Sequence, residues 1–180
     1  MGIGGADIRH LILVGLPGSG KTTVGILLGE KLDRPCWDVD RLIEEKIGRT
    51  IVEIWKLEGE SSFREKEMAS VLELVAAEEP SVISPGGGWA AQDGALESVA
   101  EKAVTVYLQT SPSVAAARTD ASEHRPILHS GEKNRNAVLE SLFEARKRRY
   151  EQCDVTVKTD ERTPEDVSIE VARLARTLLG

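Results

Sequence analysis

Short apolar runs alternate along this chain with longer segments in which apolar residues recur every three or four positions. The short runs are bounded by glycine, proline or polar residues, which predicts strands at 10–14, 36–39, 82–83, 103–108 and 155–157. Helical spacing predicts helices at 20–32, 41–47, 52–77 and 134–152, one beginning at Pro112, and one from 164 to the end. Strands that alternate with helices form a parallel sheet covered on both faces. We therefore expect an α/β fold of three layers around a central five-stranded parallel sheet, built as a single domain over 1–180.

The composition narrows the class of protein. A formal charge of −7 argues against a general nucleic-acid binder, which needs a basic face to neutralise phosphates. The two cysteines, Cys36 and Cys153, lie far apart and have no metal-binding spacing. The longest apolar run is far shorter than the roughly 20 residues that cross a bilayer. We expect a cytoplasmic protein without a membrane or nucleic-acid partner, and a monomer is the simplest expectation.

The strongest chemical signal is a phosphate-binding loop at 15–22. Its sequence, Gly-Leu-Pro-Gly-Ser-Gly-Lys-Thr, fits the pattern G-x-x-x-x-G-K-[ST] in full. The loop follows a predicted strand and opens a predicted helix, the context in which backbone N–H groups and the helix N-terminus bind phosphates. Lys21 would place its charge on the β- and γ-phosphates of ATP, and the Thr22 hydroxyl would be a ligand of Mg²⁺. The residues predicted to hold the nucleotide here are Gly18, Ser19, Gly20, Lys21, Thr22 and Thr23.

Two carboxylates follow the second predicted strand. Asp38 and Asp40 come at its carboxyl end, where open α/β sheets bind ligands, and residues two apart on a strand share a face. One carboxylate can serve the shell of the magnesium ion, and the other can orient and deprotonate an attacking hydroxyl. A strand-to-helix turn with Asp40 as a helix N-cap explains the same residues equally well.

Two further features favour an acceptor site. Arg64 offers a planar fork to a carboxylate, and Glu67 one helical turn later is placed to hold it, although an exposed helix ion pair has the same spacing. Gly86, Gly87 and Gly88 follow the third predicted strand and allow a ligand to approach the backbone closely. A flexible loop is the plainer explanation of the triplet, and its place at the ligand-binding edge of the sheet favours the site.

Taken in order, these motifs resemble those of the shikimate kinases over nearly the whole chain. The resemblance rests on the phosphate loop, D-x-D at 38–40, F-R-x-x-E at 63–67, the glycine triplet at 86–88 and Arg125-Pro126. It implies the P-loop kinase fold with a mobile lid at about 119–132. It also implies transfer of the γ-phosphoryl group of ATP, with Mg²⁺, to the 3-hydroxyl of shikimate.

The resemblance also implies roles for single residues. Asp40 would contact the hydroxyls of shikimate and act as base or orienting group, and Asp38 would lie near the magnesium ion through water. Arg64 and Arg146 would bind the carboxylate of shikimate, while Gly86, Gly87 and Gly88 give backbone contacts. Arg125 would close over the γ-phosphate as the lid arginine. The adenine wall would comprise Arg118 and 159–164, with Arg162 stacking there.

The sequence departs from the family pattern at two positions, and other functions stay open. Arg148 stands in R-x-P-x-Y where the family usually has proline, and bulky Trp89 follows the triplet, near the expected pocket. A kinase of a related polyol acid such as gluconate remains an alternative, as does a non-catalytic nucleotide-binding module. A nucleoside monophosphate kinase is a third, although no separate base-recognition segment is evident.

Overall fold

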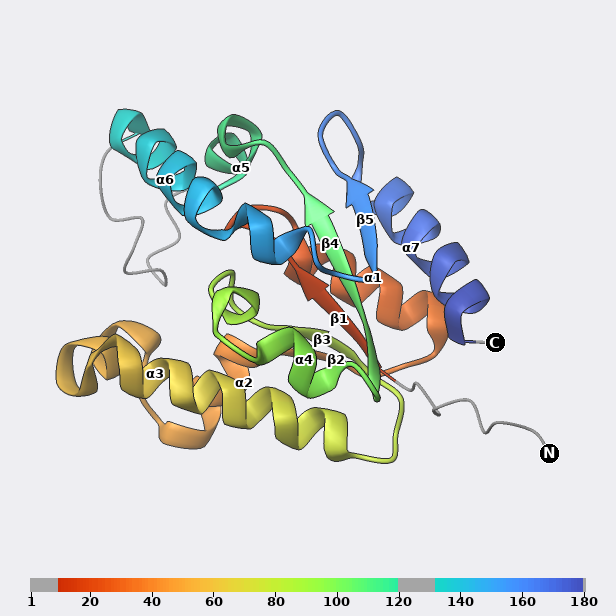
Figure 1. Ribbon diagram of the computed structural model, residues 1–180, viewed down its shortest axis with the longest axis horizontal. Coiled ribbons are helices and arrows are strands. Elements are labelled where there is room, and N and C mark those ends of the chain that lie inside the picture. The colour runs from red at the N-terminus through yellow and green to blue at the C-terminus, as the bar shows by residue number, and fades with distance from the viewer. Residues whose placement is uncertain (1–9, 120–131, 180) are drawn as a thin grey trace.

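The computed structural model describes residues 10–119 and 132–179, and its strands form one sheet (Figure 1). The sheet has the order β2-β3-β1-β4-β5, and every pairing is parallel. Its strands are β1 (His10–Val14), β2 (Cys36–Asp38), β3 (Val82–Ser84), β4 (Ala103–Gln109) and β5 (Val155–Lys158). The predicted five-stranded parallel sheet is confirmed, and each strand lies within one residue of its predicted bounds.

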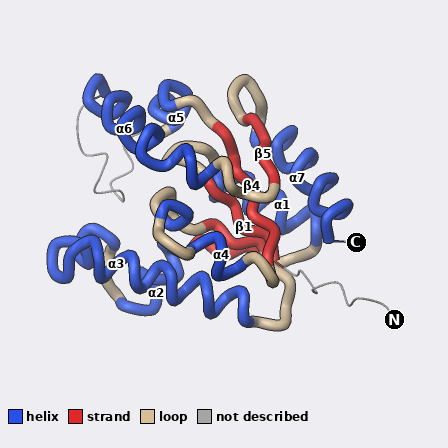
Figure 2. Tube along the Cα trace, in the orientation of Figure 1, coloured by secondary structure: helices blue, strands red, loops and turns tan. Residues whose placement is uncertain are grey.

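Helices cover both faces of this sheet (Figure 2). They are α1 (Lys21–Leu32), α2 (Val39–Ile47), α3 (Ile51–Ala76), α4 (Ala95–Val99), α5 (Pro112–Arg118), α6 (Glu132–Tyr150) and α7 (Pro164–Leu179), with the 3₁₀ helix η1 (Trp89–Ala91). No helix within 10–119 or 132–179 is both long and apolar enough to cross a membrane.

The side chains of β1 explain why the sheet needs a helical layer on each face. Leu11 and Leu13 are fully buried in a core that includes apolar residues of α1 and α7. Ile12 and Val14 point the other way, into a second core that includes apolar residues of α2 through α6. Since successive strand residues face opposite sides, an unbroken apolar run requires cover on both. The predicted three-layer arrangement is confirmed.

Local signals set the limits of α3. Thr50 is its N-cap, and the hydroxyl of Thr50 accepts a hydrogen bond from the backbone N–H of Glu53 at 3.2 Å. The Glu53 carboxylate in turn accepts from the backbone N–H of Thr50 at 2.8 Å, which completes a capping box. Gly59, with φ of 85°, interrupts the helical geometry, so α3 consists of two helical stretches.

Two parts of the fold differ from the prediction. α2 begins at Val39, so Asp38 ends β2 and caps the helix, and its carboxylate accepts a hydrogen bond from the backbone N–H of Arg41 at 3.3 Å. The alternative that Asp40 is the N-cap is therefore wrong, as is the expectation that Asp38 and Asp40 share a strand face. The short elements η1 and α4 were not predicted, because five or fewer residues carry too little periodicity.

The connections after β1, β2 and β3 leave the same edge of the sheet, because parallel strands end together. β1 is followed by the loop that opens α1, β2 by Asp38, and β3 by 85–88. The consecutive strands β3 and β4 lie on opposite sides of β1. This makes the edge a topological switch point, where open sheets bind ligands.

Candidate active site

The phosphate loop joins β1 to α1, as predicted. Lys21 is the first residue of α1 and is only 5 % exposed. Its ammonium group donates hydrogen bonds to the carbonyls of Gly15 (2.9 Å) and Leu16 (3.0 Å), at the start of the same loop. The loop therefore holds the cation at the N-terminus of α1, where backbone N–H groups are available to an anion.

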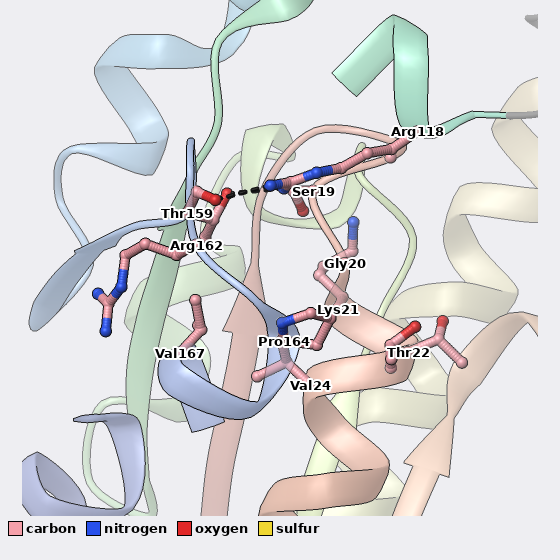
Figure 3. Close-up of a pocket in the computed structure, with 12 residues that line it drawn as sticks. Ser19, Gly20, Lys21, Thr22, Val24, Arg118, Thr159, Arg162, Pro164 and Val167 are labelled. Atoms are coloured by element: carbon pink, nitrogen blue, oxygen red, sulfur yellow. Dashed lines mark hydrogen bonds between the residues drawn. The ribbon is translucent and has the colours of Figure 1, made fainter. Parts of the chain in front are cut away.

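A cavity of about 360 Å³ opens beside this loop (Figure 3). Arg118, at the end of α5, reaches across it and donates to the hydroxyl (3.1 Å) and the carbonyl (2.7 Å) of Thr159. The structure thus brings together the loop and the two segments predicted to form the adenine wall. The lining comprises Gly18, Ser19, Gly20, Lys21, Thr22, Thr23, Val24, Arg118, Thr159, Arg162, Pro164 and Val167.

Arg162 lines the cavity, but its guanidinium points away from Lys21 (Figure 3). The guanidinium makes an ion pair with Glu170 and donates to the carbonyls of Lys158 (3.2 Å) and Asp166 (3.1 Å). Stacking on a base would require Arg162 to leave these partners. Arg125 lies outside the described residues, as does nearly all of the predicted lid.

Oxygen ligands suited to Mg²⁺ lie at Thr22, which lines this cavity, and at Asp38 beside it. The Thr22 hydroxyl donates to the Asp38 carboxylate at 2.8 Å, and this hydrogen bond is exposed. Mg²⁺ is bound through one or two protein oxygens, with water and substrate phosphates completing the octahedron. Among the described residues no cluster of His, Cys, Asp or Glu could hold a metal by itself. The pair therefore fits an ion that arrives with a nucleotide.

A second group of charged residues surrounds the glycine triplet. Arg64 donates to the Glu67 carboxylate at 2.7 Å and, on its other side, to that of Glu60 at 3.1 Å. The Arg64 side chain is 17 % exposed and its guanidinium carbon lies 5.8 Å from the ring centre of Trp55. Glu67 is fully buried, so the predicted hold of Glu67 on Arg64 is present and the exposed-pair alternative is wrong.

Each glycine of the triplet makes room for a different neighbour. A Cβ atom on Gly86 would lie 2.5 Å from a carboxylate oxygen of Glu67 and 3.2 Å from one of Asp40. A Cβ on Gly87 would lie 2.9 Å from the ring of Pro17 in the phosphate loop, and one on Gly88 would overlap the Arg64 guanidinium. The glycines thus admit the protein's own side chains, an explanation that the expectation of ligand approach did not include.

Arg146, on α6, completes the group. Its side chain is buried, with 9 % exposed, and within the described part of the chain it forms no ion pair with a carboxylate. Its neighbour Tyr150 donates a hydrogen bond to the carbonyl of Gly87. Burial raises the pKa of Tyr150 to about 12, although the charge of Arg146 and its hydrogen bond with Tyr150 act to lower that pKa. A buried guanidinium without an acidic partner is suited to pair with an incoming carboxylate or phosphate.

The other cations of the basic run at 146–149 have separate roles. Arg149 forms ion pairs with Asp93 (2.7 Å) and Glu97 (3.3 Å), which tie α6 to α4 and the turn before it. Arg148, in place of the family's proline, is exposed. Trp89 is fully buried in the core, so it can act on the pocket only through packing.

Sequence reasoning missed one polar partner in this site. Gln92 donates from its carboxamide to the buried Glu67 at 2.9 Å. Nothing in its local sequence distinguishes it from a surface glutamine, because the contact joins segments 25 positions apart.

The comparisons with known proteins agree with this geometry. A family model described as shikimate kinase matches residues 17–176. A shikimate kinase of Chromohalobacter salexigens is 37% identical, with 93% of this chain and 92% of the relative covered. One of Pseudomonas entomophila is 38% identical, with 91% and 94% covered. Among solved structures, shikimate kinase from Acinetobacter baumannii in complex with shikimate has a TM-score of 0.88 and 32% identity, with 96% of each chain covered. A gluconokinase from Sinorhizobium meliloti reaches 0.59 at 24% identity over 96% of each chain, a likeness of fold alone.

The buried Glu67 predicts a pH dependence of stability. Burial raises its pKa from 4.5 to about 7, with the Arg64 charge opposing and the Asp40 charge adding to the rise. Since the folded-state pKa is the higher one, the stabilisation is present below the unfolded value and is lost as the pH rises toward 7. At about 1.4 kcal/mol per unit, the loss is at most about 3 kcal/mol.

Glu67→Gln cannot titrate at this position. Its free energy of unfolding should therefore rise relative to the unmodified protein by up to about 3 kcal/mol between pH 4.5 and 7.5. Urea titrations of both proteins across that range measure the difference. A difference that stays constant with pH would show that Glu67 does not titrate there.

Proposed function

This chain belongs to the shikimate kinase family, and we propose that it transfers the γ-phosphoryl group of ATP to the 3-hydroxyl of shikimate. The observation that carries the proposal is the buried Arg146, which has no acidic partner among the described residues. A carboxylate on the acceptor would neutralise it, and the planar guanidinium matches that group. Arg64 offers a second guanidinium at the same glycine triplet.

The two substrates would meet across the triplet. Gly87 lies against Pro17 of the phosphate loop. Gly86 and Gly88 lie against Glu67 and Arg64, which belong to the charged residues proposed to bind the acceptor. An acceptor hydroxyl near Asp40 would therefore lie next to a γ-phosphate on the loop. Phosphoryl transfer depends mainly on such positioning and on charge neutralisation.

We assign the roles as follows. Lys21 and the backbone of the phosphate loop bind the phosphates, and Asp40 orients the attacking hydroxyl and accepts its proton. Thr22 and Asp38 would hold Mg²⁺, which when bound neutralises charge on the β- and γ-phosphates. Arg125 as lid arginine and Arg162 at the adenine remain predictions. A single domain, a cytoplasmic location, a monomeric state and the lack of nucleic-acid or membrane partners are likewise predictions from the sequence.

An assay of ADP release tests the proposed function directly. With Mg²⁺ and ATP, ADP release should depend on shikimate, while gluconate should give no more than the rate without acceptor. Release that depends on gluconate would reassign the acceptor. Equal rates in all three reactions would mean that the acceptor is neither acid, or that the protein only binds nucleotide.

Asp40→Asn should separate chemistry from nucleotide binding. Asp40 lies at Gly86 and does not line the nucleotide cavity, so the variant should bind ATP as before by calorimetry. Loss of the base should lower kcat about 10²–10⁴-fold. The matched control Asp38→Asn keeps an acceptor for the Thr22 hydroxyl but removes the carboxylate charge offered to Mg²⁺, so it should instead raise the KM for MgATP. Loss of ATP binding in Asp40→Asn would show that the assigned role is wrong.

Two alanine substitutions in the triplet should have different effects. In Gly88→Ala the new methyl group displaces the Arg64 guanidinium, the flexible end of a side chain, so the KM for shikimate should rise about tenfold or more with the fold intact. In Gly87→Ala the methyl group meets Pro17 and the Gly15 carbonyl (3.0 Å), which are fixed. That variant should lose ATP affinity and thermal stability. Steady-state kinetics and melting curves measure both, and the same pattern in the two variants would contradict the prediction.

A further inference from the structure

Gln92 lies directly after η1, where backbone hydrogen bonds fix it on both sides. Its N–H donates to the carbonyl of Trp89 (3.0 Å), and its carbonyl accepts from the N–H of Ala95 (3.2 Å). Its side chain extends to α3 and donates to Glu67. This residue is thus a link between the segment that follows the glycine triplet and the helix that carries Arg64.

We propose that Gln92 is a positioning residue for the acceptor: its carboxamide fixes the buried Glu67, and Glu67 in turn fixes Arg64 over Gly88. The inference rests on the proposed function, because it takes Arg64 to bind the acceptor's carboxylate. Gln92 itself does not line the nucleotide cavity.

The geometry at Glu67 is the first argument. A single oxygen, Oε2, accepts from Nη1 of Arg64 at 2.7 Å and from Nε2 of Gln92 at 2.9 Å. The two donors come from different elements, so together they fix Oε2, while a hydrogen bond from the Gly86 backbone also lowers the pKa of the carboxyl. Arg64 alone could not do so, since it sits on the same helix three residues earlier and moves with its partner.

Burial of Glu67 is the second argument. The carboxylate is 0 % exposed, so water cannot replace a lost donor. A buried charged group that loses a hydrogen bond is penalised more than an exposed one, and its neutral form becomes favoured. Protonated Glu67 would no longer hold Arg64 by charge. The Gln92 hydrogen bond therefore stabilises the ionised form that orients Arg64.

The charges around Glu67 favour a neutral donor as the group that stabilises its ionised form. Arg64 faces it from α3 and Asp40 from α2, while Arg146 and Tyr150 on α6 lie near Arg64. Asp40 disfavours the ionised Glu67, and a cationic side chain in place of Gln92 would compete with Arg64 for it. A carboxamide donates without adding charge.

Gln92→Met is the main test, because methionine keeps the length of the side chain and removes the donor. The titration of the Glu67 δ-carboxyl, followed by ¹³C NMR without nucleotide or acceptor, should move about one pH unit higher. At pH 7.5 such a shift lowers the ionised fraction of Glu67 about threefold, so the KM for shikimate should rise about threefold, with kcat and the KM for ATP changed far less. Gln92→Glu, which replaces the donor by a charge, should move the titration further in the same direction.

Asp93→Asn is the matched control from the next position. Asp93 is 99 % exposed and pairs with Arg149, which keeps Glu97 as a second partner. The control should leave both the Glu67 titration and the KM for shikimate unchanged.

Three results would overturn the inference. One is an unmoved Glu67 titration in Gln92→Met. Another is a moved titration with an unchanged KM for shikimate. The third is a fall in kcat together with similar rises in the KM for shikimate and the KM for ATP, which would indicate a structural role only. If the unmodified protein does not act on shikimate, the proposed function fails together with the positioning role built on it, while the titration still decides whether Gln92 holds Glu67.

Discussion

The ion pair between Arg64 and Glu67 is the contact around which the charged residues beside the glycine triplet are arranged. A fully buried carboxylate needs donors from the protein itself, and Arg64 and Gln92 both donate to its Oε2 atom. The pair can form only because Gly86 and Gly88 have no side chain where Glu67 and Arg64 approach the backbone. Desolvation raises the pKa of Glu67 to about 7, so this arrangement costs stability at neutral pH. The ion pair therefore contributes a fixed position for the Arg64 guanidinium, not stability.

The start of α2 separates the tasks of the two aspartates. On a continued strand Asp38 and Asp40 would face the same way. Because the helix begins at Val39, Asp38 stays with the phosphate loop and accepts from Thr22, while Asp40 approaches Gly86. Two carboxylates two positions apart thus lie at different parts of the site, one at Thr22 and one at Gly86. A change of backbone geometry at a single residue produces this division.

The sequence predicts those parts of the structure that have local causes. The buried strand at 10–14, the phosphate loop and the pairing of Arg64 with Glu67 each depend on residues within a few positions of one another. The contact of Gln92 with Glu67 and that of Arg149 with Asp93 join segments far apart in the sequence. The pattern of apolar and polar residues therefore does not predict them. The start of α2 was missed by two residues, because an aspartate after a strand fits both a strand end and a helix cap. The glycine triplet was placed correctly, but its close neighbours are side chains brought by the fold.

The basic run on α6 shows how an acidic protein can bind anions. With a net charge of −7, the molecule as a whole repels both ATP and an organic acid. Helical geometry sends the four cations of the run to different sides of α6: Arg146 is buried, Lys147 and Arg149 are half-buried, and Arg148 is exposed. Arg149 is neutralised by Asp93 and Glu97, whereas Arg146 is buried and meets no acidic side chain among the described residues. Exposed charges are screened within about 10 Å, but a desolvated guanidinium is not. Under the proposed function, anion binding would therefore depend on which cation is buried without an acidic partner more than on the net charge.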